Sequence, residues 1–225
     1  MPINNPNVDN PVQKYIRWSS KEKAFVYYDK DKEDNVKLDE LEIIVLDELC
    51  TVRGFDSKTE TPIRANEIRN THTDKLNVNI SGDNITGYWA DIKEEVKGRG
   101  GKFSLSTYSL RRVDGKWELD LVQLTGGALS AWFDTKINTG VNGVKWTGSE
   151  EVKNKAITYY VPVYEALALT PEDMNIAEEE NRKLQEYLNS RSIERPTDVT
   201  VVHKSDDVVI EDIDDKPIDL SEIPF

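Results

Sequence analysis

The sequence is poor in the residues that hold metal ions and carry out most acid–base catalysis. Its 225 residues include one cysteine, Cys50, and two histidines, His72 and His203, which lie far apart in the chain. A structural zinc ion needs four ligands of these kinds, and a lone cysteine cannot form an internal disulfide, so neither is expected. No nucleophile elbow, P-loop, dinucleotide fingerprint or H-x-x-x-H motif is present. We therefore expect no catalytic residues, no metal and no cofactor.

Long apolar runs and an excess of positive charge are also missing. No run could span a membrane and no apolar signal segment opens the chain, which predicts a cytoplasmic protein. The net charge is -13, of which residues 206–225 carry -7 and residues 1–205 carry -6. Coating of duplex DNA driven by bulk charge is therefore not expected. The high charged fraction of 32% indicates that part of the chain is disordered.

The acidic C-terminus is the most one-sided stretch of the sequence. Eight acidic residues and one base lie between Asp206 and Phe225, and the stretch ends in the apolar tripeptide Ile223-Pro224-Phe225. Like charges keep such a segment solvated. An apolar tip on an acidic segment is typical of a docking peptide, in which Phe225 fills a pocket and carboxylates meet a basic rim. The predicted docking residues are Asp214, Asp215, Asp219, Glu222, Ile223, Pro224 and Phe225. The alternative is a disordered tail that ends in phenylalanine by chance.

The middle of the chain has the pattern of a β-rich domain. Residues 41–52 are apolar at both odd and even positions, which predicts a central strand of a curved sheet or barrel. Residues 103–113 and 116–124 read as strands joined by a hairpin turn at Asp114-Gly115. Helices are predicted from Thr86, with Ile92 and Val96 inward, and after Thr125. The predicted fold is mainly β with a few helices, a β-barrel resembling an OB fold.

Four segments follow from these patterns. We expect a flexible N-terminus at residues 1–12, an OB-like domain that binds single-stranded DNA at 13–168, an acidic helix at 169–192 and a disordered acidic tail at 193–225. The helix begins at a capping signal, Thr170-Pro171-Glu172-Asp173, and has a thin apolar seam of Leu184, Tyr187 and Leu188.

Residues 29–40 imitate a calcium-binding loop only in part. Asp29, Asp31, Glu33 and Glu40 match ligand positions of an EF-hand, but Asp34 stands where the loop needs glycine. The flanking segments also read as strands rather than helices. A solvated hairpin turn is the favoured prediction.

Basic and aromatic residues gather in the middle of the chain. Residues 99–155 hold nine cations and six carboxylates, a local charge of +3. Such a region suits a phosphate backbone and bases stacked on aromatic rings, each stack contributing ~1–3 kcal/mol. Trp146, beside Lys145 in a glycine-punctuated segment, is predicted to be a loop aromatic and the main stacking residue. Tyr108 and Arg112 are predicted to face solvent together. The full predicted interface is Trp146, Lys145, Tyr108, Arg112, Arg111, Lys102, Arg99, Arg64, Arg69, Arg53, Phe55 and Tyr160.

Two resemblances point the same way. The ending D-L-S-E-I-P-F resembles the acidic tip of bacterial single-stranded-DNA-binding proteins, with the acidic triplet loosened. The runs I-V-L-D-E-L-C-T-V-R-G-F and G-G-A-L-S-A-W-F resemble bacteriophage-encoded OB-fold proteins of the same activity. The resemblance implies a non-enzymatic protein of replication, recombination and repair. Its partners would be single-stranded DNA and proteins recruited by a tip that also competes with DNA.

Two other classes of function remain open from the sequence. An acidic adaptor or DNA mimic would recruit partners without binding nucleic acid, and a virion structural protein would form large assemblies. Fluorescence quenching by oligo-dT separates single-strand binding from the adaptor.

Overall fold

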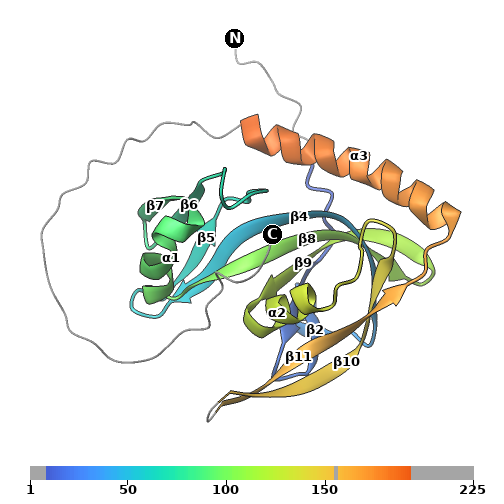
Figure 1. Ribbon diagram of the computed structural model, residues 1–225, viewed down its shortest axis with the longest axis horizontal. Coiled ribbons are helices and arrows are strands. Elements are labelled where there is room, and N and C mark those ends of the chain that lie inside the picture. Colours follow the sequence, from blue (N-terminus) through green and yellow to red (C-terminus); the bar gives the residue numbers. More distant parts are fainter. Residues whose placement is uncertain (1–8, 155–156, 194–225) are drawn as a thin grey trace, which may run out of the picture.

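The computed structural model describes residues 9–154 and 157–193, and this part of the chain is mainly β (Figure 1). The strands are β1 Tyr15–Ser19, β2 Ala24–Asp29, β3 Asp34–Lys37, β4 Leu41–Asp56, β5 Thr61–Ala65, β6 Leu76–Ile80, β7 Asp83–Gly87, β8 Gly101–Val113, β9 Lys116–Thr125, β10 Gly143–Asn154 and β11 Ile157–Leu167. The helices are α1 Trp89–Gly98, α2 Gly126–Asp134 and α3 Pro171–Ile193. None of these helices is long and apolar enough to cross a membrane. The predicted docking residues 214–225 lie outside the described residues.

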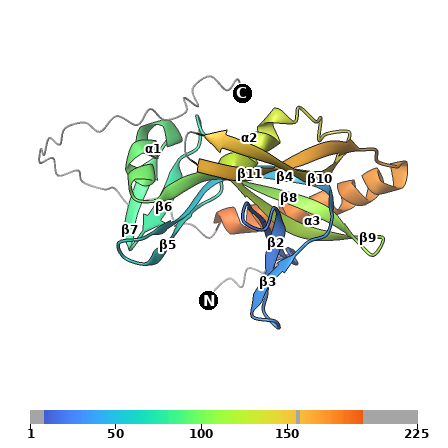
Figure 2. The same ribbon diagram turned by 90° about the horizontal axis from the view of Figure 1, so that it is seen from below.

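All the strands belong to one mixed sheet that forks at β4. The main path runs β3-β2-β1-β9-β8-β4-β5-β6-β7, with β1 and β9 parallel and the other pairs antiparallel. The N-terminal end of β4 pairs with β10, which pairs with β11, while its C-terminal end pairs with β5. Two branches therefore leave one long strand, the β10–β11 arm and the β5–β7 wing (Figures 1 and 2).

Strand β4 is covered on both faces, as its sequence pattern predicts. Ile43 packs into a cluster that includes Leu129 and Trp132 of α2, whereas its neighbour Ile44 packs with Leu184 of α3 on the other face. Each of these clusters removes large apolar side chains from water, at about 25 cal/mol per Å² of apolar surface. The prediction of a doubly buried central strand is confirmed.

The sheet is curved but is not a closed barrel, and the expected closure is wrong. A closed barrel would pair the free edge of β11 with another strand through a backbone ladder. Instead, the backbone N–H of Tyr160 donates to Ser20 Oγ at 2.8 Å, and the Tyr160 carbonyl accepts from Trp18 Nε1 at 2.8 Å. Side chains from the end of β1 and the β1–β2 turn thus satisfy the edge where a barrel would place a strand.

A third core cluster lies under the β5–β7 wing. Leu76, Val78 and Ile80 alternate toward α1, which contributes the buried Ile92 and Val96.

The predicted start of α1 is wrong. The helix begins at Trp89, after the extended residue Tyr88, and not at Thr86. Thr86 belongs to β7, where it pairs with Asn77, because the β-branched residue extends the ladder.

The acidic helix is confirmed as α3, and its N-terminus is capped as predicted. The Asp173 carboxylate accepts from the Thr170 backbone N–H at 2.9 Å, and Thr170 Oγ1 accepts from the Asp173 N–H at 3.2 Å. The expected apolar seam packs on the sheet, with Leu184 fully buried. Together the cap and the seam fix α3 across one sheet face (Figure 1).

The segment that imitates a calcium loop forms the predicted hairpin. Asp29 Oδ1 accepts backbone N–H groups of Asp31 at 3.0 Å and of Lys32 at 3.4 Å, which closes the turn between β2 and β3. Within residues 9–154 and 157–193, no group of three or more histidine, cysteine, aspartate or glutamate residues is arranged to hold a metal ion.

Candidate nucleic-acid interface

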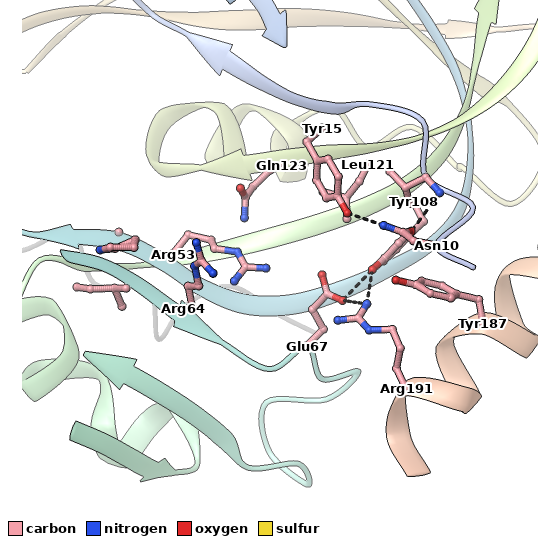
Figure 3. Close-up of a pocket in the computed structure, with 14 residues that line it drawn as sticks. Asn10, Tyr15, Arg53, Arg64, Glu67, Tyr108, Leu121, Gln123, Tyr187 and Arg191 are labelled. Atoms are coloured by element: carbon pink, nitrogen blue, oxygen red, sulfur yellow. Dashed lines mark hydrogen bonds and ion pairs between the residues drawn. The ribbon is translucent and has the colours of Figure 1, made fainter. Parts of the chain in front are cut away.

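A cleft of about 570 Å³ lies on the sheet face that α3 partly covers (Figure 3). Residues of β4, β5, β8 and β9 form its floor, β1 forms one rim, and the last turns of α3 form the other. Three arginines and one carboxylate, Glu67, are the charged residues that line it. The cleft is therefore positive, in a chain whose net charge is -13.

A row of three cations crosses the sheet at this cleft. Arg53 of β4 pairs with Arg64 of β5 on one side and with Lys102 of β8 on the other. Residues directly opposite each other in a ladder project from the same sheet face, so the three side chains emerge together. Figure 3 shows Arg53 and Arg64 side by side.

Strand alternation and a glycine place this row. Val52 and Ile63 are buried in the wing core, so their neighbours Arg53 and Arg64 must face the other way. A Cβ at Gly54 would collide with the carbonyl oxygen of Gly100. Glycine at this position therefore lets β4 lie against the start of β8, which brings Lys102 beside Arg53.

The cations of the row are not neutralised by the protein. Among the residues described, neither Arg53, Arg64 nor Lys102 forms an ion pair with a carboxylate. Burial lowers the pKa of Arg53; Glu67 opposes this shift, while the charges of Arg64 and Arg191 add to it. The arginine stays charged, but its surroundings favour an added anion. A phosphate group meets that requirement and suits the planar guanidinium geometry.

One exposed aromatic ring lies on the rim of the cleft, and another lies on the strand that carries Arg53. Phe55 follows Arg53 by two residues on the same face of β4 and is 56% exposed. Tyr15 of β1 lines the opposite rim and is 59% exposed, and its hydroxyl accepts a hydrogen bond from Asn10 at 2.8 Å. Apolar rings held open to solvent beside unpaired cations form a surface on which nucleobases can stack.

Tyr108 is buried at the base of the cleft, and the prediction that it faces solvent is wrong. It is 1% exposed, and its hydroxyl donates to Glu67 Oε2 at 2.8 Å. Arg191 of α3 donates to the same carboxylate oxygen at 3.0 Å and to the Tyr108 hydroxyl at 3.1 Å. Burial, with Glu67 beside it, raises the pKa of Tyr108. The one carboxylate that lines the cleft is thereby paired, which leaves Arg53 and Arg64 as the available cations.

Trp146 and Lys145 lie away from the cleft, and the prediction that they belong to a loop is wrong. Both are in β10, paired with β4 and β11. The Trp146 ring packs edge-on against Trp18 and Phe25, with centroids 5.9 and 5.7 Å apart. Lys145 Nζ contacts Glu42 at 2.8 Å. The glycines of this segment were interpreted as markers of a loop. In the structure, Gly143 permits close packing against the Ile43 carbonyl, and Gly148 lies at a bulge.

The other predicted arginines outside the cleft are engaged in ion pairs. Arg111 is buried against Asp120, and Arg112 lies over the Trp117 ring within 3.6 Å of Glu42 and 3.5 Å of Asp173. Arg69 makes two hydrogen bonds of 2.7 Å to Asp47, and Arg99 contacts Asp83 at 3.0 Å. The predicted set is therefore split, because only Arg53, Arg64 and Tyr108 line the cleft, with Lys102 and Phe55 beside them.

Tyr160, also predicted for the interface, lies on β11 in the other branch of the sheet. Its hydroxyl donates to Glu151 at 2.8 Å, and the Lys23 ammonium stands 3.7 Å from its ring centroid. These contacts hold the Tyr160 side chain on the β10–β11 arm. It does not line the cleft or lie on the sheet face that holds the cleft, which is called the cleft face below.

Sequence reasoning missed Tyr15, Gln123 and Arg191, which line the cleft from β1, β9 and α3. Their assembly depends on the parallel pairing of β1 with β9 and on the docking of α3, neither of which local patterns reveal. One signal was present in the sequence. The apolar Ile16, which is buried, lies between Tyr15 and Arg17, which are exposed.

Comparison with known proteins gives no relative: no family model, curated protein or solved structure matches the chain.

Proposed function

We propose that the cleft face binds single-stranded DNA without sequence specificity, as a non-catalytic protein of replication, recombination or repair. The observation that carries the proposal is the row of Arg64, Arg53 and Lys102, which lacks carboxylate partners among the described residues and shares its sheet face with the exposed rings of Phe55 and Tyr15. On a chain of net charge -13, cations without carboxylate partners are expected where an anionic ligand supplies the balancing negative charge.

Single strands suit this surface better than duplexes. The bases of a duplex are already stacked on one another, whereas an unpaired strand can place bases on Phe55 and Tyr15 while its phosphates meet the cation row. The end of α3, with Tyr187 and Arg191, stands over one side of the cleft and narrows the approach. We also propose that the fold is related to OB folds. A strongly curved, mostly antiparallel sheet with a basic face supports this relationship.

The acidic C-terminus is proposed to compete with DNA for the cleft and to recruit replication and repair proteins through Ile223-Pro224-Phe225. Arg191, on the last turn of α3, lines the cleft rim, and residues 194–225 follow directly in the chain. A chain reaches up to ~3.3–3.6 Å per residue, so the acidic residues can reach Arg53 and Arg64. A segment with eight carboxylates offers these cations an alternative to phosphate.

The test is fluorescence anisotropy with labelled oligo-dT and a matched duplex at two salt concentrations. Wild type is expected to bind the single strand more tightly, with affinity falling as salt rises. Arg64→Glu should weaken binding about 10- to 100-fold at low salt, because it removes a phosphate contact and adds repulsion. Lys116→Glu is the matched control, since Lys116 is an exposed cation at the opposite end of the β8–β9 hairpin. Equal losses in the two variants would refute the assignment of the cleft.

Deletion of residues 206–225, which removes all eight carboxylates of the acidic C-terminus, tests the tail separately. The truncated chain should bind oligo-dT more tightly, mainly at low salt, where competition between acidic peptide and DNA is strongest. Unchanged affinity at every salt concentration would contradict competition. Absence of oligo-dT binding by both chains would instead favour the acidic adaptor.

A further inference from the structure

A further exposed aromatic ring, Tyr28, lies beyond Tyr15 on the sheet face that holds the cleft. Ile16 of β1 pairs with Tyr27 of β2, and both pack toward the α2 side of the sheet. Tyr15 and Tyr28 occupy the next step of the ladder, so they project from the opposite face, where the cleft lies. Tyr15 is 59% exposed and Tyr28 is 58% exposed. Tyr15 lines the cleft, whereas Tyr28 stands one strand further out, about 4.8 Å away in the sheet.

Cations flank this tyrosine pair on the same face. Arg17 pairs with Val26, and Val26 pairs with Lys37, so Arg17 and Lys37 project beside the tyrosines. Both are exposed, and neither forms an ion pair with a carboxylate in residues 9–154 or 157–193. Arg17 donates to Asn35 Oδ1 at 3.2 Å.

The two carboxylates in the strands of this hairpin, Asp29 and Asp34, face away from the tyrosine pair. They pair with each other one step beyond Tyr28, which places them on the opposite face of β2 and β3. Within β1, β2 and β3, the face that carries the tyrosine pair therefore carries cations and no carboxylate. Gln123 of β9 bridges the two regions, since it lines the cleft and pairs with Arg17.

We infer that Tyr15 and Tyr28 form a second base-stacking subsite, the tyrosine platform, for a single strand that extends beyond the cleft. This inference rests on the proposed function. It adds the path of the bound strand, which runs from the cation row across Gln123 to β1 and β2. Cross-strand tyrosine pairs also stabilise hairpins, but that role does not call for two unpaired cations beside them. A strand that fills only the cleft misses Tyr28, whereas a longer strand can stack on it.

The test is a length series of oligo-dT, from about four to about sixteen nucleotides, measured by anisotropy with the full chain. Wild-type affinity is expected to rise with length. Tyr28→Ala should lose about ten-fold in affinity for the longest strand, the size of one lost stacking contact, and stay within about two-fold for the shortest. Tyr28→Phe keeps the ring and should behave as wild type.

Phe133→Ala is the matched control, because Phe133 of α2 is a partly exposed ring on the other side of the sheet. It should leave the length series unchanged. If Tyr28→Ala binds every length as wild type does, or weakens all lengths equally, the platform is wrong while the cleft assignment stands. If wild type binds no oligonucleotide of any length, the proposed function fails and the platform falls with it.

Discussion

The cleft and the rest of the sheet use the same residue types in opposite ways. Outside the cleft, Arg111, Arg112 and Lys145 are each matched with carboxylates, and Asp120 is completely buried. In the cleft, Arg53 and Arg64 have no such partner among the described residues. The comparison teaches that a count of cations does not single out a candidate anion site, whereas cations without carboxylate partners that gather at one cleft do.

The largest difference between the two regions should appear in stability. Arg111→Ala would leave the Asp120 carboxylate buried without its cation, which costs about 3–5 kcal/mol in the free energy of unfolding. Arg64→Ala removes an exposed side chain without an ion-pair partner and should change that energy by at most ~0.5 kcal/mol. Urea unfolding of both variants measures the two values. Similar losses would break the distinction between a structural and a functional set of arginines.

Trp146→Ala sharpens the comparison for aromatic rings. Because the Trp146 ring packs against Trp18 and Phe25, its removal should lower the free energy of unfolding by about 3 kcal/mol, near the lower bound for a large ring in a core. Phe55→Ala, which removes an exposed ring, should cost less than ~1 kcal/mol and should weaken binding of oligo-dT instead. Chemical unfolding and anisotropy on the same samples separate the two outcomes. A stable Trp146→Ala variant with lost DNA binding would restore Trp146 as the stacking residue.

Much of the fold could be predicted from the sequence, because several signals are local. Three local signals were interpreted correctly: the apolar residues at both odd and even positions of 41–52, the turn at Asp114-Gly115 and the cap at Thr170. Barrel closure could not be read in this way. It depends on whether the edge of β11 meets a strand or the side chains of Trp18 and Ser20.

The site was predictable only in part, for a similar physical reason. Arg53, Phe55 and Arg64 belonged to the predicted interface, and strand alternation in the structure places Arg53 and Arg64 opposite a buried core. The sequence pattern also predicts that Arg112 and Tyr108 face solvent, but α3 covers that part of the same sheet face. Only the packing of a helix some sixty residues later in the chain decides which half of the face stays open to solvent.

The smallest expected effect concerns pH and the carboxylate of Glu48, which forms no ion pair with any residue that the structure describes. Burial raises the pKa of Glu48, although its carboxylate accepts a hydrogen bond from Trp132 Nε1 at 2.7 Å. A raised folded-state pKa means that the folded chain holds this proton more tightly than the unfolded chain does. The contribution is present below the unfolded pKa and is lost as pH rises through the folded pKa. Glu48→Gln should flatten this slope of unfolding free energy between about pH 4 and the folded pKa, measured by urea titrations at several pH values. An unchanged slope would show that Glu48 does not titrate differently on folding.

Ultraviolet crosslinking of the full chain to oligo-dT, followed by peptide mapping, tests the central claim most directly. The account predicts adducts on cleft-face aromatic residues, Tyr15 and Phe55, and their loss in the Arg64→Glu variant. Adducts confined to Trp146 or Tyr160 on the β10–β11 arm would contradict it, because that arm would then hold the strand and the unpaired arginines would need another explanation.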